Sequence, residues 1–386
     1  MPIDIILLNI TCVNFFMLAF IAFLNPLRVN IIANRWFGIF LFSVGCMLLN
    51  VIIDVTKAND KYAQLIAFNE LSRFALAPAL YLGVLYYTSA TNSFIKKQYL
   101  HFIPFAVFFI CTISYVIKPH TSIFNSAWFP EILKNALQIF IVLSVRIQLP
   151  VYWALSWYRL VRHQKSIQMV ASNTTPVNLN WLKYLLLGLF VMILLSYNDT
   201  LFKIQFLKTF SPMAYLSGTL FITYFLLRQK EIYPYEEREL EDINLLINET
   251  KKNPVTRPRF SSEYLADLKT KVVILMEHEQ LFLDNELSLP ELAKKLAVSP
   301  HDLSYLLNEG FGVNFFQFVN TYRVNEAKRL MLSDKHRHLN MLGIAYSAGF
   351  NSKTTFNTAF KKETGLSPSQ YIEEIKTDNS PAASFQ

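Results

Sequence analysis

A pattern that occurs twice near the C-terminus carries the clearest chemical meaning in this sequence. It occupies residues 292–307 and again residues 344–360, and its alanines, Ala293 and Ala345, are 52 positions apart. In each copy a small residue follows the alanine by four positions and an apolar residue follows it by five. This spacing predicts two helices joined by a tight turn, a unit that presents its second helix to the major groove of DNA. The predicted chemistry is recognition of base edges and phosphates.

Sequence signatures of catalysis are missing. The chain has no glycine-rich phosphate loop, no Gly-x-Ser-x-Gly and no His-Glu-x-x-His. Its three cysteines, Cys12, Cys46 and Cys111, lie in apolar segments and have the spacing neither of a metal site nor of a disulfide framework. We therefore expect no enzymatic activity, no cofactor and no bound metal.

The repeated pattern lies in the more polar part of an unusually apolar chain. Of 386 residues, 53% are hydrophobic, and the mean hydropathy is +0.28. Residues 1–228 hold nearly all the long apolar runs and carry 17 Lys/Arg against 6 Asp/Glu, whereas the remainder carries 19 against 22. The net charge of +8 therefore belongs to the apolar part, where it indicates membrane topology and says little about nucleic acid.

Seven apolar segments are long enough, or nearly so, to cross a bilayer, which takes roughly 20 residues. They lie near residues 4–24, 36–55, 65–88, 99–117, 134–158, 181–201 and 211–228. The connections on one side carry nine Lys/Arg against five on the other, which predicts that the N-terminus lies outside and the C-terminus in the cytoplasm. We therefore expect a multi-pass protein of the inner, cytoplasmic membrane, with the repeated pattern on the side where DNA is found.

Ionisable residues inside these segments are costly to bury in lipid. Glu70 and Arg73 are three positions apart and could pair on one helix face, and Arg146 lies midway along the fifth segment. One interpretation is a polar pocket that binds a signal or ligand. The alternative is a structural pair, or side chains that extend to the membrane surface.

The remainder of the chain divides into a linker, a connecting helix and the unit with the repeated pattern. Residues 229–261 read as a solvated cytoplasmic linker, and apolar residues at helical spacing predict a connecting helix over 262–282. Ser288-x-x-Glu291, Ser299-Pro300 and Ser367-x-x-Gln370 are typical of helix starts. We expect residues 376–386 to form a disordered tail.

The segments Leu289-Pro290-Glu291-Leu292-Ala293, Ala348-Gly349-Phe350-Asn351-Ser352 and Gly365-x-Ser367-Pro368 resemble the DNA-binding domain of the AraC family of bacterial transcription regulators. The match covers about 285–375 and is most specific in the second unit. The layout of seven spans followed by this domain is similar to membrane-embedded members found in Bacteroidetes-type bacteria. The resemblance implies an all-helical domain over 283–375 that binds promoter DNA.

Carried over by position, the resemblance implies two sets of DNA-contacting residues. The first reading helix would present Pro300, His301, Ser304, Tyr305 and Asn308, and the second Ser352, Lys353, Thr354, Thr355, Asn357 and Lys361. Asparagine can pair with adenine, hydroxyls are adaptable, and lysine suits phosphate or guanine. The chain departs from the family in having no Arg or Lys between Ser299 and Glu309.

Charge balance predicts weak binding by one copy of this domain. Residues 284–374 contain 10 basic and 10 acidic residues, without the basic footprint usual for DNA binding. Dimerisation or clustering at the membrane would raise the affinity.

The sequence therefore predicts an all-α protein: a seven-helix transmembrane sensor-like domain over 1–228, followed by a soluble domain with two helix-turn-helix units. Its expected partners are double-stranded promoter DNA, the lipid bilayer, a second copy of the chain and an unknown small-molecule or protein signal. Two alternatives remain open at this point: a transporter or channel with a regulatory cytoplasmic domain, and release of the soluble part by proteolysis in the linker.

Overall fold

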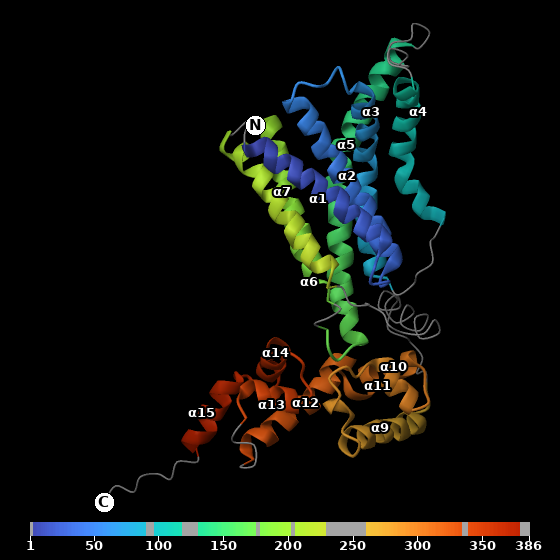
Figure 1. The fold of residues 1–386 in the computed structure, drawn as a ribbon. Coiled ribbons are helices and arrows are strands. Elements are labelled where there is room, and N and C mark those ends of the chain that lie inside the picture. The colour runs from blue at the N-terminus through green and yellow to red at the C-terminus, as the bar shows by residue number, and fades with distance from the viewer. Residues whose placement is uncertain are drawn as a thin grey trace, which may run out of the picture. The chain divides into compact units, whose positions relative to one another are not determined.

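Helices make up all the named elements in the part of the chain that the structure describes (Figure 1). The computed structural model describes residues 3–89, 96–117, 130–174, 178–201, 205–228, 260–333 and 339–378. Within these ranges the predicted all-α class is confirmed. The contacts divide the chain into two compact units, one of residues 1–162 and 179–232, the other of residues 163–178 and 233–386.

A helix coincides with each of the seven apolar segments, and all seven lie wholly or mainly in the first unit. They are α1 (Ile3–Leu24), α2 (Ile31–Val55), α3 (Ala63–Tyr87), α4 (Ile103–Ile117), α5 (Glu131–Ser166), α6 (Asn180–Leu201) and α7 (Gln205–Leu226), with a 3-10 turn at Lys96–Phe102 before α4. In the described residues, two helical stretches, Ile5–Leu24 and Ile31–Val55, are long and apolar enough to cross a membrane. Two such helices give a weak indication of membrane association.

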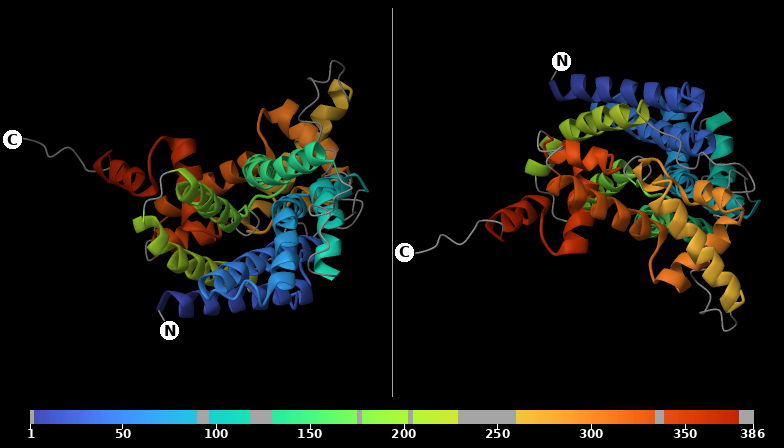
Figure 2. Two further views of the ribbon diagram at one scale, coloured as in Figure 1. Left: turned by 90° about the horizontal axis from the view of Figure 1, so that it is seen from above. Right: turned by 90° about the horizontal axis from the view of Figure 1, so that it is seen from below.

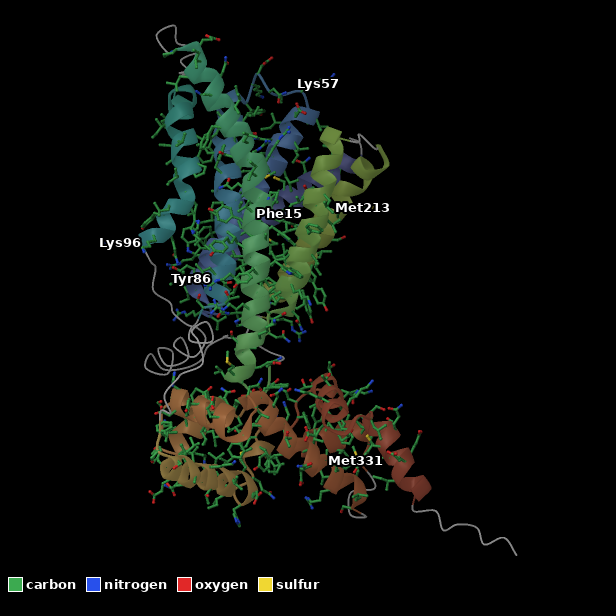
Figure 3. The ribbon with its side chains drawn as sticks, turned by 180° about the vertical axis from the view of Figure 1, so that it is seen from behind. Phe15, Lys57, Tyr86, Lys96, Met213 and Met331 are labelled. Atoms are coloured by element: carbon green, nitrogen blue, oxygen red, sulfur yellow. The ribbon has the colours of Figure 1, made fainter. Side chains whose placement is uncertain are left out.

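Small residues let the first three helices of this unit approach closely. A β-carbon on Gly38 of α2 would lie 3.2 Å from the carbonyl oxygen of Ala19 in α1, and one on Gly83 of α3 would lie 3.4 Å from the backbone nitrogen of Phe37. Helix α1 also packs along α7 (Figure 2). Aromatic rings pack between α3 and α6, where Tyr87 and Trp181 meet edge to face with ring centroids 5.5 Å apart. Phe15 of α1, labelled in Figure 3, is also buried.

The second unit contains eight helical elements in the described part of residues 260–386. They are α9 (Ser262–Glu277), the 3-10 turn η4 (Leu281–Leu283), α10 (Leu289–Lys295), α11 (Pro300–Phe311), α12 (Phe315–Leu332), α13 (Met341–Ser347), α14 (Lys353–Thr364) and α15 (Pro368–Asp378). The connecting helix predicted over 262–282 is therefore shorter and ends at Glu277. Gln280 then takes a left-handed conformation, with φ of 51°, and the chain turns into η4.

Two hydrophobic cores underlie the two copies of the sequence pattern. The first joins α9, α10, α11 and the start of α12 around Leu292, Leu303 and Phe318. The second joins the rest of α12 to α13 and α14 around Ile344, Phe356 and Phe360. Met331, labelled in Figure 3, packs against this second core. Helix α12 contributes to both cores and so joins the two helix-turn-helix units.

Candidate nucleic-acid interface

The two copies of the repeated pattern fold with the same backbone hydrogen bonds. In the first copy the amide of Val298 donates to the carbonyl of Ala293 at 3.1 Å, and in the second the amide of Phe350 donates to Ala345 at 3.0 Å. The small residue before each donor has a positive φ, 56° at Ala297 and 88° at Gly349. These matching turns confirm the helix-turn-helix geometry that the spacing predicted.

Side-chain caps fix where the helices of each unit begin. The Ser288 hydroxyl accepts from the Glu291 amide at 3.4 Å while the Glu291 carboxylate accepts from the Ser288 amide at 2.8 Å. Ser299 caps α11 and Ser352 caps α14 in the same way, each accepting from an amide three residues on, at 3.1 Å. Such caps satisfy amides that have no partner inside the helix. They set the first turn of α11 and α14, the second helix of each helix-turn-helix unit.

Helix α14 is amphipathic, with one face buried and the other exposed. Phe356 and Phe360 are buried in the second core. The opposite surface exposes Lys353, Thr354, Asn357 and Lys361, while Thr355 is half-buried, its amide held by Ser352. The structure therefore leaves most of the residues that the resemblance implied on this helix open for contact.

Helix α11 is much less accessible. Pro300, His301 and Ser304 are buried, His301 with 8% of its surface exposed and Ser304 with 6%. Tyr305 is half-buried and meets the ring of Phe260 edge to face, with centroids 5.7 Å apart. Of the residues predicted on α11, only Asn308 is exposed, and its side-chain amide donates to the Ser304 carbonyl at 2.9 Å. The roles of these residues in DNA binding stay predictions.

Arg323 of α12 is the central residue that sequence reasoning did not single out. Its side chain is 1% exposed, yet its Nε donates to the Phe282 carbonyl and its Nη2 to the Asp284 carbonyl, both at 2.7 Å. The guanidinium carbon also lies 5.9 Å from the centroid of the Phe350 ring. Arg323 thus connects η4 of the first core to the turn of the second helix-turn-helix unit. The sequence contains one signal for this role: Arg323 lies within a helix and is flanked by residues of the hydrophobic core.

Burial lowers the pKa of Arg323 to about 10, well below its usual range, and the charge of Asp284 opposes that shift. The group therefore remains protonated at neutral pH. A guanidinium presents its donors in a planar fork, which suits two carbonyls on different sides better than an ammonium would. The charge is offset by carbonyl dipoles and by the face of an aromatic ring.

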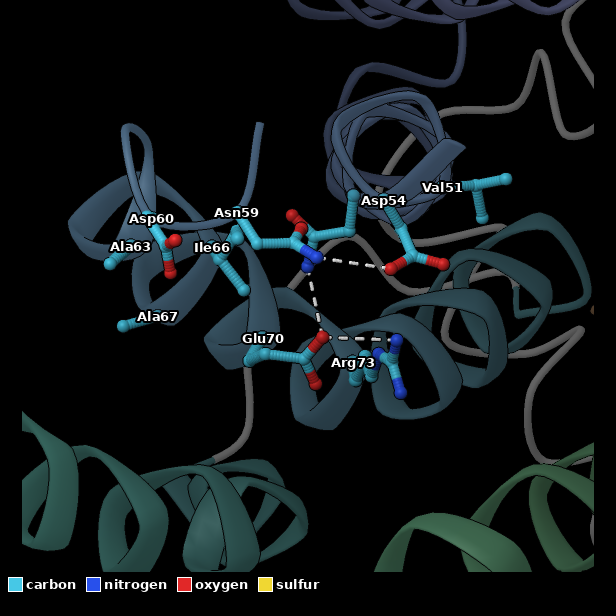
Figure 4. Close-up of a pocket in the computed structure, with 10 residues that line it drawn as sticks. Val51, Asp54, Asn59, Asp60, Ala63, Ile66, Ala67, Glu70 and Arg73 are labelled. Atoms are coloured by element: carbon cyan, nitrogen blue, oxygen red, sulfur yellow. Dashed lines mark hydrogen bonds and ion pairs between the residues drawn. The ribbon is translucent and has the colours of Figure 1, made fainter. Parts of the chain in front are cut away.

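The first unit contains a polar cavity of about 600 Å³ between α2 and α3 (Figure 4). Asn50, Asp54, Glu70 and Arg73 are among the residues that line it. The Glu70 carboxylate accepts from the Asn50 amide at 2.9 Å and pairs with Arg73 at 3.0 Å, and Asn69 donates to Asn50 at 2.8 Å. This network brings together two of the three ionisable residues that sequence analysis singled out.

Arg146 is placed differently from Glu70 and Arg73. It is exposed on α5 and is not among the residues that line the cavity. The sequence interpretation grouped it with the other two because all three lie inside apolar segments. Glu70 and Arg73 lie on the same helix, α3, whereas Arg146 lies on α5. Only the tertiary structure decides whether residues on different helices meet.

Comparison with known proteins gives the C-terminal part of the chain a class. Residues 292–374 match the family described as helix-turn-helix domain, of the AraC type. The chain is 24% identical over 146 residues to the uncharacterised HTH-type transcriptional regulator YtdP of Bacillus subtilis (strain 168), which is 37% of this chain and 18% of that protein. It is 34% identical over 101 residues to the uncharacterised HTH-type transcriptional regulator SACOL0084 of Staphylococcus aureus (strain COL), which is 26% of this chain and 13% of that protein.

The matches to these two relatives cover 146 and 101 residues of this chain. The chain spans less than a fifth of the length of these relatives. No solved structure matches the chain significantly. The matched domain and the relatives together support a DNA-binding transcription regulator.

Proposed function

We propose that this protein is a membrane-embedded transcription regulator that binds promoter DNA through α14 and α11 and couples a signal at its membrane domain to gene expression. The observation that carries the DNA-binding part is the repeated turn geometry, in which Val298 and Phe350 donate equivalent hydrogen bonds. The exposed polar face of α14 then supplies the side chains for base and phosphate contacts.

The membrane part of the proposal rests on apolar surfaces of the first unit that face away from its core. On α1 the side chains of Ile10, Val13, Met17, Phe20 and Leu24 are all exposed. Along α5 the same holds at Ile139, Leu143, Ile147, Val151 and Leu155, and along α6 at Tyr184, Leu187, Val191 and Leu194. Stripes three or four residues apart, on several helices that are also apolar inside, are costly in water and favourable in lipid. A bilayer accounts for the exposure of all three.

A seven-span topology predicts on which side of the membrane each connection lies. We expect the N-terminus and the loops near Lys57, Lys118 and Lys203 outside, and the C-terminus inside. Fusions of alkaline phosphatase and of a fluorescent protein after these positions and after Gln386 test this. Phosphatase activity at the three loops, with fluorescence at the C-terminus, supports the proposal. Phosphatase activity at the C-terminus contradicts it.

DNA recognition is tested with the full chain in lipid nanodiscs. Sites selected from random duplexes by the wild-type protein serve as the probe. Replacing both Lys353 and Asn357 by alanine removes one phosphate or guanine contact and one adenine contact, so affinity should fall by about 10- to 100-fold. Lys271→Ala is the matched control, since it removes one exposed cation from α9, far along the chain from α14. Equal affinities of the double variant and the wild type would end the proposed role of α14.

The low net charge of the domain bears on how it binds. Lysines 294, 295, 353, 361 and 362 are exposed in the two helix-turn-helix units, and Lys295 is paired with Glu279 at 3.3 Å. One domain therefore offers few free phosphate contacts. We propose that two copies bind adjacent sites, with the membrane keeping their local concentration high.

The polar cavity between α2 and α3 is our candidate for the signal site. It combines carboxylates, an arginine and amides in one recess, the donor set that a small polar ligand would need. A ligand acts only by favouring one state of the protein over another.

A further inference from the structure

The chain between α5 and α6 belongs to the DNA-binding unit. Residues 163–178 fall in the same compact unit as α9 to α15, although α9, the first of these helices, begins only at Ser262. We call the described part, residues 163–174, the α5–α6 segment. It ends α5 and contains the 3-10 turn η3 (Ile167–Met169), which lies against α12. Ile167, Val170 and Ser172 are almost completely buried.

Backbone hydrogen bonds join this segment to the start of α10. The amide of Leu289 donates to the Val170 carbonyl at 2.8 Å, and the amide of Ser172 donates to the Leu287 carbonyl at 3.3 Å. Ala171 and Ser288 form the antiparallel bridge between these two bonds. Leu289 is the first residue of α10, where an amide has no partner inside its own helix. The segment therefore supplies a partner that the DNA-binding helices lack among themselves.

Ser172 continues the contact into the interior of the unit. Its hydroxyl donates to the Leu287 carbonyl at 2.5 Å and accepts from Nη2 of Arg323 at 3.0 Å. Its carbonyl accepts from Nη1 of Arg323 at 3.4 Å. The hydroxyl thus uses its one proton on Leu287 and a lone pair on the guanidinium, a consistent assignment of donors.

The contact falls at the point where the two helix-turn-helix units meet. The same guanidinium that binds Ser172 also binds the carbonyls of Phe282 and Asp284 and lies over the Phe350 ring. Phe282 belongs to the first core and Phe350 to the second. The spacing between α11 and α14 on DNA depends on how these two cores are held together.

We infer that the α5–α6 segment is a third structural member of the DNA-binding domain. It holds Arg323 at the junction of the two helix-turn-helix units and keeps the reading helices at the spacing that DNA requires. This inference rests on the proposed DNA-binding function for its consequence, but the contact itself does not depend on DNA. Because the segment is continuous with α5 and α6, the first unit can influence DNA affinity through it as well as through residues 229–261.

The contact is tested by a disulfide across the bridge. Ala171 and Ser288 are a pair without mutual hydrogen bonds, whose Cα atoms typically lie about 4.5 Å apart, within the range of about 4.4–6.8 Å that a disulfide needs. The full chain, without its native cysteines, would carry Ala171→Cys and Ser288→Cys and a protease site between Asn253 and Pro254. After oxidation in membranes and cleavage, the two fragments should stay joined until a reductant is added. A chain with Gln168→Cys and Ser288→Cys is the control, because Gln168 is exposed.

Hydrogen exchange at the Leu289 amide tests the same contact without the cysteine substitutions, which remove the Ser288 cap. Ser172→Pro removes the amide that donates to Leu287 and the hydroxyl that binds Arg323. In the full chain in nanodiscs, this variant should expose Leu289 to exchange, and Gln168→Ala should not. Separated fragments in the disulfide experiment, together with unchanged protection of Leu289 in Ser172→Pro, overturn the inference.

The consequence for DNA is measured with the sites selected by the wild-type protein. Loosening the junction adds an ordering cost to binding, so Ser172→Pro should weaken affinity by at least about fivefold. Gln168→Ala should bind as the wild type does. Unchanged or tighter binding by Ser172→Pro contradicts the inferred role. Failure of the proposed function looks different, because the wild-type protein would then select no DNA site while the disulfide still formed.

Discussion

Gly349 lies against the backbone of Phe282 so closely that a β-carbon at position 349 would be 2.4 Å from the Phe282 carbonyl oxygen. The same β-carbon would lie 2.9 Å from the Cα of Leu283. Gly349 is in the turn of the second helix-turn-helix unit, and Phe282 belongs to the core of the first. The two helix-turn-helix units are therefore packed against each other, backbone to backbone, beside Arg323.

Gly349→Ala should destabilise the DNA-binding unit strongly. Its φ of 88° is unfavourable for alanine, and the added carbon meets backbone atoms that have no flexible end to move away. We expect a loss of about 3 kcal/mol or more in the free energy of unfolding. Pulse proteolysis in urea, on the solubilised full chain with a C-terminal tag, measures it.

Gly312→Ala is the matched control for that experiment. Gly312 ends α11 with φ of 69° and has nothing within 4 Å of an added β-carbon. Only the conformational cost of about 1 kcal/mol should appear there. Similar losses for both variants would show that the close approach to Phe282 has no energetic consequence.

Arg323→Lys should be far from conservative. An ammonium cannot serve the carbonyls of both Phe282 and Asp284, and a buried carbonyl left without a donor costs about 1–3 kcal/mol. We expect about 2–4 kcal/mol of destabilisation. Arg329→Lys, on the same helix, changes an exposed pair with Glu326 at 2.7 Å and should cost less than about 1 kcal/mol. Equal effects of the two substitutions in the same unfolding assay would remove the structural role of Arg323.

DNA binding should depend only modestly on salt. Each neutralised phosphate contributes about −0.9 to the slope of log affinity against log salt concentration, and the domain has few free cations. Lys353→Ala and Lys361→Ala should each make the slope shallower by about 1. Lys271→Ala should leave it unchanged. A salt titration of binding to the selected duplex decides this, and a slope that neither α14 variant alters would place the phosphate contacts on other residues.

The cavity between α2 and α3 should govern the response to the signal and not the binding of DNA. Glu70→Gln removes the charge that pairs with Arg73 and keeps an oxygen that can accept from Asn50. A promoter reporter should lose its response to the inducing condition, while affinity for DNA in nanodiscs stays within about twofold of wild type. Glu131→Gln, an exposed position at the start of α5, is the control. A normal response in Glu70→Gln would exclude this carboxylate from signal sensing.

The amino-acid sequence determined the local structure of this protein well. Apolar runs predicted where α1 to α7 lie. An apolar segment in a bilayer or a packed core must satisfy its backbone hydrogen bonds without water, and a helix does this within the segment. Serines followed by glutamate or glutamine marked helix starts, and the caps at Ser288 and Ser367 are those predicted. The alanine-to-small-residue spacing likewise predicted both turns, since each depends on neighbours within six residues.

Contacts between distant parts of the chain were decided only by the tertiary structure. Glu70 and Arg73 could be paired from their spacing, but their connection to Asn50 on another helix could not. Burial of His301 and Ser304 on α11 has no local signal, since both are polar and lie on a helix surface in the sequence pattern. The contact between Ser172 and Arg323, 151 positions apart, is the clearest case. Its energy comes from satisfying buried polar groups, and which groups are buried together is a property of the folded chain alone.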